Sequence, residues 1–366
     1  MRGFGFAEHG GYERLGYVQI PDPEPGPGEV RIRVRAAAFN RLDRFTLEGI
    51  PGVAVERPHV LGSDGAGIVD RCGEGVTDLA VGTNVVLNPG LWDGTCDACR
   101  AGREALCRNF RIVGEHTQGT AAPYLVVPRR NVHLLPDRLT FVEGAAVPLV
   151  FQTAWRALRT VGEVAPGDRV AIVGAGGGVP TAAVQVAKLL GATVVVASRS
   201  LEKAERCRSL GADDAVTFDE AHPLDKVLWQ WSGKRGVDVV FDSVGAPTLA
   251  RSLRATARAG RVVVIGATAG PTVEIDLRTL FWRQASIRGS TMASAGEFVE
   301  VLGHLAAGRL RPVIDSTVPF DRADAALRRF DASDLFGKVV VELPDGEPAD
   351  RRPAPGTPRG KTAPVE

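Results

Sequence analysis

Hydrophobic and polar positions follow two different patterns in the two halves of the chain. In the first half, a proline- and glycine-rich stretch after residue 18 leads into the alternating pattern IRVR at residues 32–35, which predicts a half-buried strand. Short valine-rich runs separated by glycine and proline continue to about residue 135. This half is therefore predicted to consist mainly of β-strands.

From residue 169 the apolar runs become nearly continuous. They are RVAIVG (169–174), TVVVAS (193–198), VDVVFDSVG (237–245) and RVVVIG (261–266), and segments with helical spacing lie between them. Strands that are buried on both faces and alternate with helices predict an α/β fold with a parallel, doubly wound sheet. After about residue 290 the pattern is mixed up to KVVVEL (338–343), and the polar, proline-rich tail 344–366 is predicted to be disordered.

Length and composition limit the classes of protein. A chain of 366 residues that is 44% hydrophobic can form two cores, so two domains are expected. A net charge of +1 and scattered arginines argue against partners such as nucleic acid or a membrane surface. No apolar run is long enough for a membrane helix, and the N-terminal residues lack the apolar core of a signal peptide, so a cytoplasmic location is expected. Five cysteines, three of them clustered, favour reduced thiols that hold a metal over disulfides.

The turn after the first buried strand carries the features of a dinucleotide site. Glycines there would let the backbone approach a pyrophosphate, and free amides at the start of the next helix would attract its charge. The residues expected at the phosphates are Gly174, Gly176, Gly177, Gly178 and Val179. Pro180 stands where the last glycine of the fingerprint is expected, which is compatible with a first helical turn but raises the question of how closely helix and strand pack.

The end of the second apolar run indicates which dinucleotide binds. An acidic residue is expected there in a protein that binds NAD, but the sequence has Ser198, Arg199 and, one helical turn later, Lys203. A guanidinium can bind the extra phosphate of NADP through paired hydrogen bonds. NADPH is therefore the predicted cofactor, and the alternative is an exposed arginine at the start of a solvated helix.

Several motifs, in this order, resemble those of the medium-chain dehydrogenase/reductase superfamily over residues 1–343. They are PDPEPGPGEVRIRVRA, VLGSDGAGIV, the cysteine cluster, GEHTQGTAAPYLVVP, AAVPLVFQTAWRAL, the glycine-rich turn and FGKVVVEL. The resemblance implies a GroES-like β-barrel catalytic domain formed by residues 1–151 and 289–343, and a Rossmann domain at 152–288, with cofactor and substrate between them. It further implies cofactor contacts at Thr153, Gly266 and Lys338, with pairing to Asp64 as the alternative for Lys338.

The cysteine cluster resembles the structural zinc site of zinc alcohol dehydrogenases in this superfamily. The spacing Cys-x2-Cys-x2-Cys-x7-Cys of that site is occupied here by Asp93, Cys96, Cys99 and Cys107. A carboxylate oxygen binds zinc at about the same distance as an imidazole nitrogen, so the aspartate can complete a tetrahedron. One structural Zn²⁺ is predicted, and free buried thiols are the alternative.

The catalytic zinc ligands of the same enzymes are all absent. Their positions are occupied by Asn40, Ser63 (with Asp64 after it) and Leu149, and amide, hydroxyl and alkyl groups cannot replace thiolate and imidazole around zinc. The hydroxyl and imidazole of the family's proton relay are replaced by Leu42 and Phe45. His59 precedes Ser63 by four residues, but a lone histidine behind Pro58 is expected to be a loop residue rather than a substitute ligand.

The surviving chemistry is hydride transfer to an electrophilic carbon of a small molecule. A quinone or a conjugated carbonyl delocalises the incoming charge itself, so conjugate reduction is the predicted activity, as in the zinc-free quinone oxidoreductases and enoyl reductases that this sequence resembles. The amide of Asn40 is expected to donate to the substrate oxygen. Asp43 is expected either to orient neighbouring groups or to cap a helix, and solvent is expected to supply the α-proton because no histidine, tyrosine or lysine stands out as its donor.

Two alternative functions remain open. One is metal-independent reduction of a ketone or aldehyde, or oxidation of an alcohol. The other is a protein that binds NADPH in a sensing or structural role without catalysis. The family resemblance also implies a homodimer or a higher oligomer, in which an edge strand of the Rossmann sheet pairs across the interface; RVVVIG (261–266) and SIRGSTM (286–292) supply suitable strands.

Overall fold

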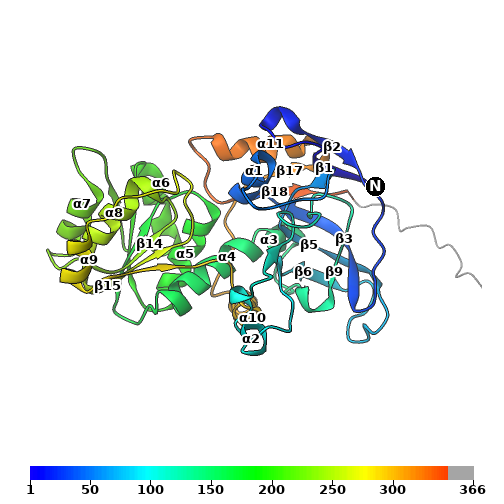
Figure 1. Ribbon diagram of the computed structural model, residues 1–366, viewed down its shortest axis with the longest axis horizontal. Helices are drawn as coiled ribbons and strands as arrows, with labels where there is room; N and C mark the ends of the chain where they lie inside the picture. Colours follow the sequence, from blue (N-terminus) through cyan, green and yellow to red (C-terminus); the bar gives the residue numbers. More distant parts are fainter. Residues whose placement is uncertain (345–366) are drawn as a thin grey trace, which may run out of the picture.

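The computed structural model describes residues 1–344, which form two parts joined side by side (Figure 1). One part is built on a parallel sheet and the other on antiparallel strands. The predicted disordered tail lies, apart from Pro344, outside the described residues. Within residues 1–344, no helix is long and apolar enough to span a bilayer.

The parallel sheet confirms the predicted α/β architecture. Its six strands have the order 3-2-1-4-5-6 of a doubly wound fold, namely β13 (Asp214–Thr217), β12 (Thr193–Ser198), β11 (Arg169–Val173), β14 (Val237–Asp242), β15 (Thr256–Val264) and β16 (Ser286–Gly289). Helices cover both faces: α5 (Gly178–Leu189), α6 (Leu201–Arg206), α7 (Leu224–Trp231), α8 (Ala246–Ala255) and α9 (Leu277–Arg283). Successive side chains of β11 point to opposite faces of the sheet: Ile172 packs in the core on one face and Ala171 in the core on the other. Because both faces are buried, the strand sequence is apolar without interruption.

The other part is assembled from both ends of the chain. Its central strand β3 (Glu29–Ala38) pairs with β5 (Asp64–Cys72), with β9 (Tyr124–Pro128) and with the last strand, β18 (Lys338–Glu342). The same sheet continues through β6 (Asn84–Leu87), β10 (Val132–Leu134) and β17 (Ile314–Pro319). Smaller sheets are formed by β1 (Arg2–Phe6), β2 (Leu15–Gln19) and β4 (His59–Val60), and by β7 (Gly90–Leu91) and β8 (Arg111–Ile112).

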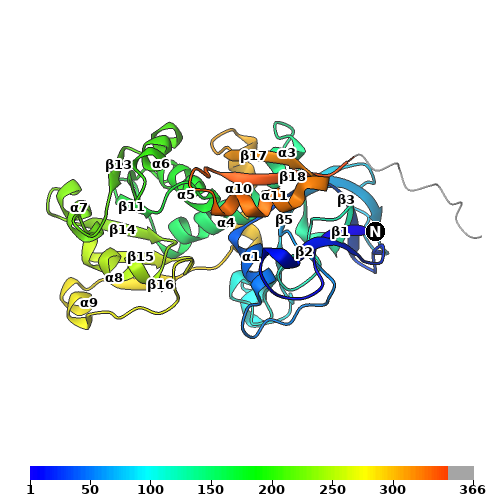
Figure 2. The same cartoon turned by 90° about the horizontal axis from the view of Figure 1, so that it is seen from above.

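Helices complete this part and connect it to the parallel sheet. They are α1 (Arg41–Glu48), α2 (Asp97–Arg100), α3 (Phe141–Ala145), α4 (Pro148–Trp155), α10 (Ala295–Ala306) and α11 (Ala323–Arg328). Figures 1 and 2 both place α4 between the two parts. Apolar side chains of α4 and α10, among them Phe151 and Val301, belong to the core on one face of the parallel sheet. A second link is a backbone hydrogen bond of 2.7 Å from the N–H of Gly337 to the carbonyl of Gly176.

Candidate active site

The start of α1 places Asn40 at the junction of the two parts. Asn40 is the N-cap of the helix, and its backbone N–H donates to Oδ2 of Asp43 at 2.6 Å. The other carboxylate oxygen of Asp43 accepts the N–H of Gly62 at 2.6 Å, so this side chain also fixes the loop before Ser63. Asp43 is fully buried, and this burial raises its pKa to about 7. The structure therefore gives Asp43 the capping and orienting role.

Lys338 lies at the centre of a buried polar cluster with Asn40 and Asp64. Its Nζ donates to the carbonyl of Phe39 at 2.9 Å, to Oδ1 of Asn40 at 2.6 Å and to Oδ2 of Asp64 at 2.7 Å. The ammonium group has three N–H bonds, and these three contacts use all of them. Oδ1 of Asp64 accepts the backbone N–H of Leu149 at 2.8 Å, so the cluster also holds the start of α4.

The cluster determines which way the amide of Asn40 points. Its oxygen faces the ammonium of Lys338, and its Nδ2 donates to Asp64 at 2.9 Å. The opposite orientation would place N–H groups against the ammonium and the amide oxygen against the carboxylate, which is repulsive on both sides. One of the two Nδ2 hydrogens is used by Asp64, and no acceptor for the second is found within residues 1–344.

This arrangement does not fit a zinc ion. Asn40, Ser63 and Leu149 provide neither thiolate nor imidazole, and the Lys338 ammonium already binds the Asn40 oxygen. A divalent cation at the same place would be repelled by that ammonium. His59 does not supply a ligand, since it is fully buried in β4 with its Nε2 3.0 Å from the carbonyl oxygen of Gly114.

The predicted metal ligands do come together, in the loop that contains α2. The ligand atoms of Asp93, Cys96, Cys99 and Cys107 lie within 4.8 Å of one another, and they form the one group of three or more potential metal-binding side chains found among residues 1–344. Three thiols and a carboxylate in this arrangement fit a four-coordinate zinc ion.

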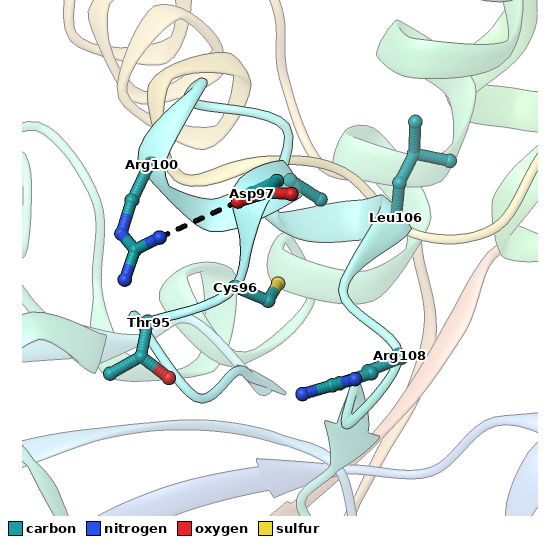
Figure 3. Close-up of a pocket in the computed structure, with 7 residues that line it drawn as sticks. Thr95, Cys96, Asp97, Arg100, Leu106 and Arg108 are labelled. Atoms are coloured by element: carbon teal, nitrogen blue, oxygen red, sulfur yellow. Dashed lines mark hydrogen bonds and ion pairs between the residues drawn. The ribbon is translucent and has the colours of Figure 1, made fainter.

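Hydrogen bonds hold the carboxylate of Asp93 in position. Its Oδ1 accepts the N–H groups of Thr95 at 2.8 Å and Cys96 at 3.0 Å, and its Oδ2 accepts Nδ2 of Asn109 at 2.8 Å. These donors lower its pKa, with the N–H of Cys96 as the largest cause, so the side chain is ionised. A cavity of about 480 Å³ lies beside Cys96. Among its lining residues, Asp97 pairs with Arg100 at 3.4 Å, and Figure 3 shows these side chains.

The glycine-rich turn has the geometry expected for a phosphate site. Gly174 and Gly176 have φ values of +98° and +87°, a region that favours glycine. Gly177 is the N-cap of α5, whose first residues include Gly178 and Val179, and Pro180 lies in the first turn as predicted. The free N–H groups at the start of this 12-residue helix can therefore bind an anionic ligand such as a phosphate.

The residues predicted to distinguish NADPH from NADH lie at the end of β12. Ser198 is buried and its Oγ accepts the N–H of Ser200 at 3.2 Å, whereas Arg199 is exposed. The side chain of Lys203 lies over Gly176, since a Cβ there would be 2.9 Å from Cδ of Lys203. Burial lowers the pKa of Lys203.

Arg41, a residue that the sequence did not single out, lies near enough to Lys203 for its charge to lower the pKa of that lysine further. Arg41 directly follows Asn40, in the first turn of α1. A cation is unfavourable at that end of a helix dipole, and this local conflict could have indicated a phosphate ligand.

The other predicted cofactor residues lie on the two sides of the junction. Thr153 is buried on α4, with its Oγ1 3.9 Å from Sδ of Met292. Gly266 follows β15, and the nearest atom to a Cβ built there is the Ser243 carbonyl oxygen at 3.5 Å. The carbon chain of Lys338 passes between the glycine-rich turn and the polar cluster, because a Cβ on Gly178 would be 2.8 Å from its Cδ.

Several buried polar atoms near the junction have no hydrogen-bond partner among the described residues. They are Oγ of Ser63, both amide atoms of Gln152 and Oγ of Ser290. Ser63 adjoins Asp64 in the cluster, and Gln152 adjoins Thr153 on α4. Buried polar groups are usually paired, so these atoms indicate where water or a ligand is expected.

Comparisons with known proteins agree with this architecture. Residues 26–137 match the family model "Alcohol dehydrogenase GroES-like domain", and residues 178–307 match "Zinc-binding dehydrogenase". A solved structure titled "Crystal Structure of NAD-dependent alcohol dehydrogenase" superposes with a TM-score of 0.88 at 40% identity, covering 94% of this chain and 100% of that chain. These matches confirm a GroES-like domain combined with a Rossmann-type sheet.

Two curated relatives carry different activities in their names. A 2-dehydro-3-deoxy-L-galactonate 5-dehydrogenase of Pseudoalteromonas atlantica is 30% identical, covering 82% of this chain and 87% of that protein. An acryloyl-coenzyme A reductase of Sulfurisphaera tokodaii is 31% identical, covering 88% of this chain and 95% of that protein.

Proposed function

The chain belongs to the medium-chain dehydrogenase/reductase superfamily of oxidoreductases, and we propose that it reduces quinones or α,β-unsaturated carbonyl compounds with NADPH, without a catalytic metal ion. The observation that carries the proposal is the buried cluster of Lys338, Asp64 and Asn40 at the position of the family's catalytic zinc ligands. A bound cation would have to displace an ammonium group that makes three hydrogen bonds.

The absence of thiolate and imidazole ligands at Asn40, Ser63 and Leu149 limits which substrates can react. An isolated alkoxide needs a Lewis acid or a strong proton donor, whereas the oxygen of an enolate or a reduced quinone is stabilised by conjugation. A conjugated substrate therefore requires only a modest donor at its oxygen. The name of the relative from Sulfurisphaera tokodaii, an acryloyl-coenzyme A reductase, describes this kind of reduction.

The residues of this chain bind and orient the reactants. When bound, NADPH supplies the hydride. The N-terminal amides of α5 and the left-handed glycines would hold its pyrophosphate, and Thr153 would contact the nicotinamide ring. The free N–H of Asn40 donates to the substrate oxygen, while Lys338 and Asp64 keep the amide in the orientation that makes this N–H available.

The main test measures NADPH oxidation with a panel of quinones, enones and unconjugated ketones, together with alcohol oxidation in the reverse direction. The unmodified protein is expected to reduce conjugated substrates and barely to oxidise simple primary alcohols. Asn40→Ala should reduce turnover by a hundredfold or more, about 2–4 kcal/mol by comparison with single oxyanion donors. Full activity of this variant would show that the substrate oxygen is held elsewhere, and efficient alcohol oxidation would contradict the proposal as a whole.

The choice of NADPH rests on Arg199, Lys203 and the absence of an acidic residue at the end of β12, where Ser198 stands. The solved relative with 40% identity is titled NAD-dependent, so the preference of this chain must be measured. Binding of both cofactors, before and after Arg199→Asp, gives the answer. The substitution should narrow or reverse a preference for NADPH because it replaces attraction to the 2′-phosphate by repulsion. If the unmodified protein binds NADPH and NADH with equal affinity, Arg199 does not contact the 2′-phosphate.

A further inference from the structure

The loop between β8 and β9 lies directly against the backbone that carries Ser63. Gly114 has a φ of +80°, and a Cβ built on it would be 2.3 Å from the carbonyl oxygen of Gly62 and 3.1 Å from the nitrogen of Ser63. Within the loop, the N–H of Gly114 donates to Thr117 at 3.0 Å. This contact leaves no room for a side chain at position 114, so the next residue, Glu115, is held next to the Ser63 segment.

Glu115 is a buried acid without a hydrogen-bond donor. Glu115 is 8% exposed. No hydrogen bond to its carboxylate is found within residues 1–344. Nδ1 of His116 lies 3.8 Å from Oε2 of Glu115, but this nitrogen accepts the backbone N–H of Ile112 at 3.1 Å and so donates nothing to the carboxylate. Burial of an ionised carboxylate without a donor is costly, so the neutral acid is favoured.

The surrounding charges act in the same direction. Burial, followed by the negative charge of Asp43, raises the pKa of Glu115 to about 7. His116 does not oppose this effect near neutral pH, because burial and the charge of Arg111 lower its own pKa. Glu115 can therefore both release and regain a proton at physiological pH.

Two other ionisable groups at the junction, Asp43 and Lys338, are already engaged in hydrogen bonds. Both carboxylate oxygens of Asp43 accept backbone N–H groups, from Asn40 and Gly62. The ammonium of Lys338 uses all three of its N–H bonds inside the cluster. Glu115 is the buried acid in this region whose carboxyl group is not engaged by the described residues.

We propose that Glu115 is the general acid of the reaction, an inference that rests on the proposed function. Hydride addition to the β-carbon of an enone moves the C=C electron pair to the carbonyl oxygen and gives an enolate. The enolate then forms a C–H bond at its α-carbon with the proton of Glu115, leaving the carboxylate, which regains a proton from water. With a quinone, the same proton passes to the phenolate oxygen.

The first experiment follows the stereochemistry of protonation. Reduction of 2-methylcyclopent-2-enone by the unmodified protein should give one configuration at the α-carbon, because the proton comes from a fixed acid. Glu115→Gln has nearly the same shape but no acidic proton. It should lower turnover by about a hundredfold or more and give a racemic α-carbon. Glu74→Gln, at an exposed position outside this loop, is the matched control and should change neither property.

The second experiment measures the pH dependence of turnover. It tests the general-acid role of Glu115 without needing activity from Glu115→Gln. Turnover of the unmodified protein should fall as pH rises through about 7, when Glu115 loses its proton. Glu115→Asp keeps the acid and should retain both this pH dependence and the single configuration, at a lower rate. If Glu115→Gln does not fold, this variant and the pH profile of the unmodified protein decide the question.

The outcomes separate the two proposals. An unchanged configuration and pH profile in Glu115→Gln would overturn the role of Glu115 while leaving the proposed function intact. The same holds for an unmodified protein whose turnover does not fall above pH 7. Failure of the unmodified protein to reduce any quinone or enone would instead overturn the proposed function, and the role of Glu115 with it.

Discussion

At the scale of single residues, the ammonium of Lys338 holds together segments that are distant in sequence. It joins the carbonyl of Phe39, the amide of Asn40 and the carboxylate of Asp64, and the Lys338 and Asp64 side chains are 3% and 0% exposed. A buried ion pair gives little net stability compared with apolar groups, but the loss of one partner leaves an uncompensated charge. The cluster is therefore sensitive to single substitutions.

Lys338→Met should destabilise the protein by about 3–5 kcal/mol, because the carboxylate of Asp64 would stay buried without its counterion. Adding Asp64→Asn should restore part of the loss by removing that charge. Chemical denaturation of the two variants measures the difference. As a control, Lys188→Met breaks a partly exposed pair with Asp213, with side chains 32% and 41% exposed, and should cost about 1 kcal/mol or less. Equal losses from Lys338→Met and Lys188→Met would contradict a buried, tightly coupled cluster.

At the scale of elements, the loop around α2 is hardly buried, since Cys107 is the one buried residue among residues 93–108. Cys107 is buried, whereas Cys96 and Cys99 are partly exposed, and α2 has only four residues. Such a short segment does not form a stable helix by itself. Metal coordination by the four side chains is thus the expected source of its order.

Asp93→Ala should lower zinc retention and the thermal midpoint, because a structural zinc site contributes directly to folding free energy. Elemental analysis is expected to give one zinc per chain in the unmodified protein and less in the variant. Asp97→Ala is the matched control in the same loop, since its side chain is exposed and pairs only with Arg100 at 3.4 Å. Two zinc ions per chain would mean that a second metal site exists and would contradict the metal-free active site.

At the scale of the whole molecule, the outer edge of the parallel sheet is the candidate interface between copies. β16 is an edge strand, and the adjacent α9 exposes Leu277, Phe281 and Trp282 at 66%, 59% and 70%. Large exposed apolar groups next to an unpaired strand edge favour association. The predicted homodimer or higher oligomer would form through this surface.

Trp282→Asp should shift the protein toward the monomer in sedimentation or light-scattering measurements, since it places a charge in an apolar contact. Val81→Asp alters another exposed apolar residue, 66% exposed, on the antiparallel part and should not change the mass. If the unmodified protein is monomeric at high concentration, this surface is not an interface between copies.

The sequence by itself determined the features that depend on local spacing. Buried runs that alternate with helices predicted the parallel sheet, glycines between a strand and a helix predicted the phosphate turn, and four closely spaced ligands predicted the metal loop. Each of these depends on residues near one another in the chain, where the geometry of strands, helices and turns fixes their relative positions. The family resemblance added that the two ends of the chain form one domain, and the pairing of β3 with β18 agrees with it.

Only the tertiary structure decided how the active site is built. Lys338 and Asn40 are 298 positions apart in the sequence. No local pattern could therefore decide whether Lys338 binds the phosphates of the cofactor or the carboxylate of Asp64. The same applies to Glu115, whose acidity depends on burial and on Asp43, and to Asp43 itself, whose second oxygen binds the loop at Gly62. Burial and long-range pairing set the charge and orientation of these groups, and both arise only when the chain has folded.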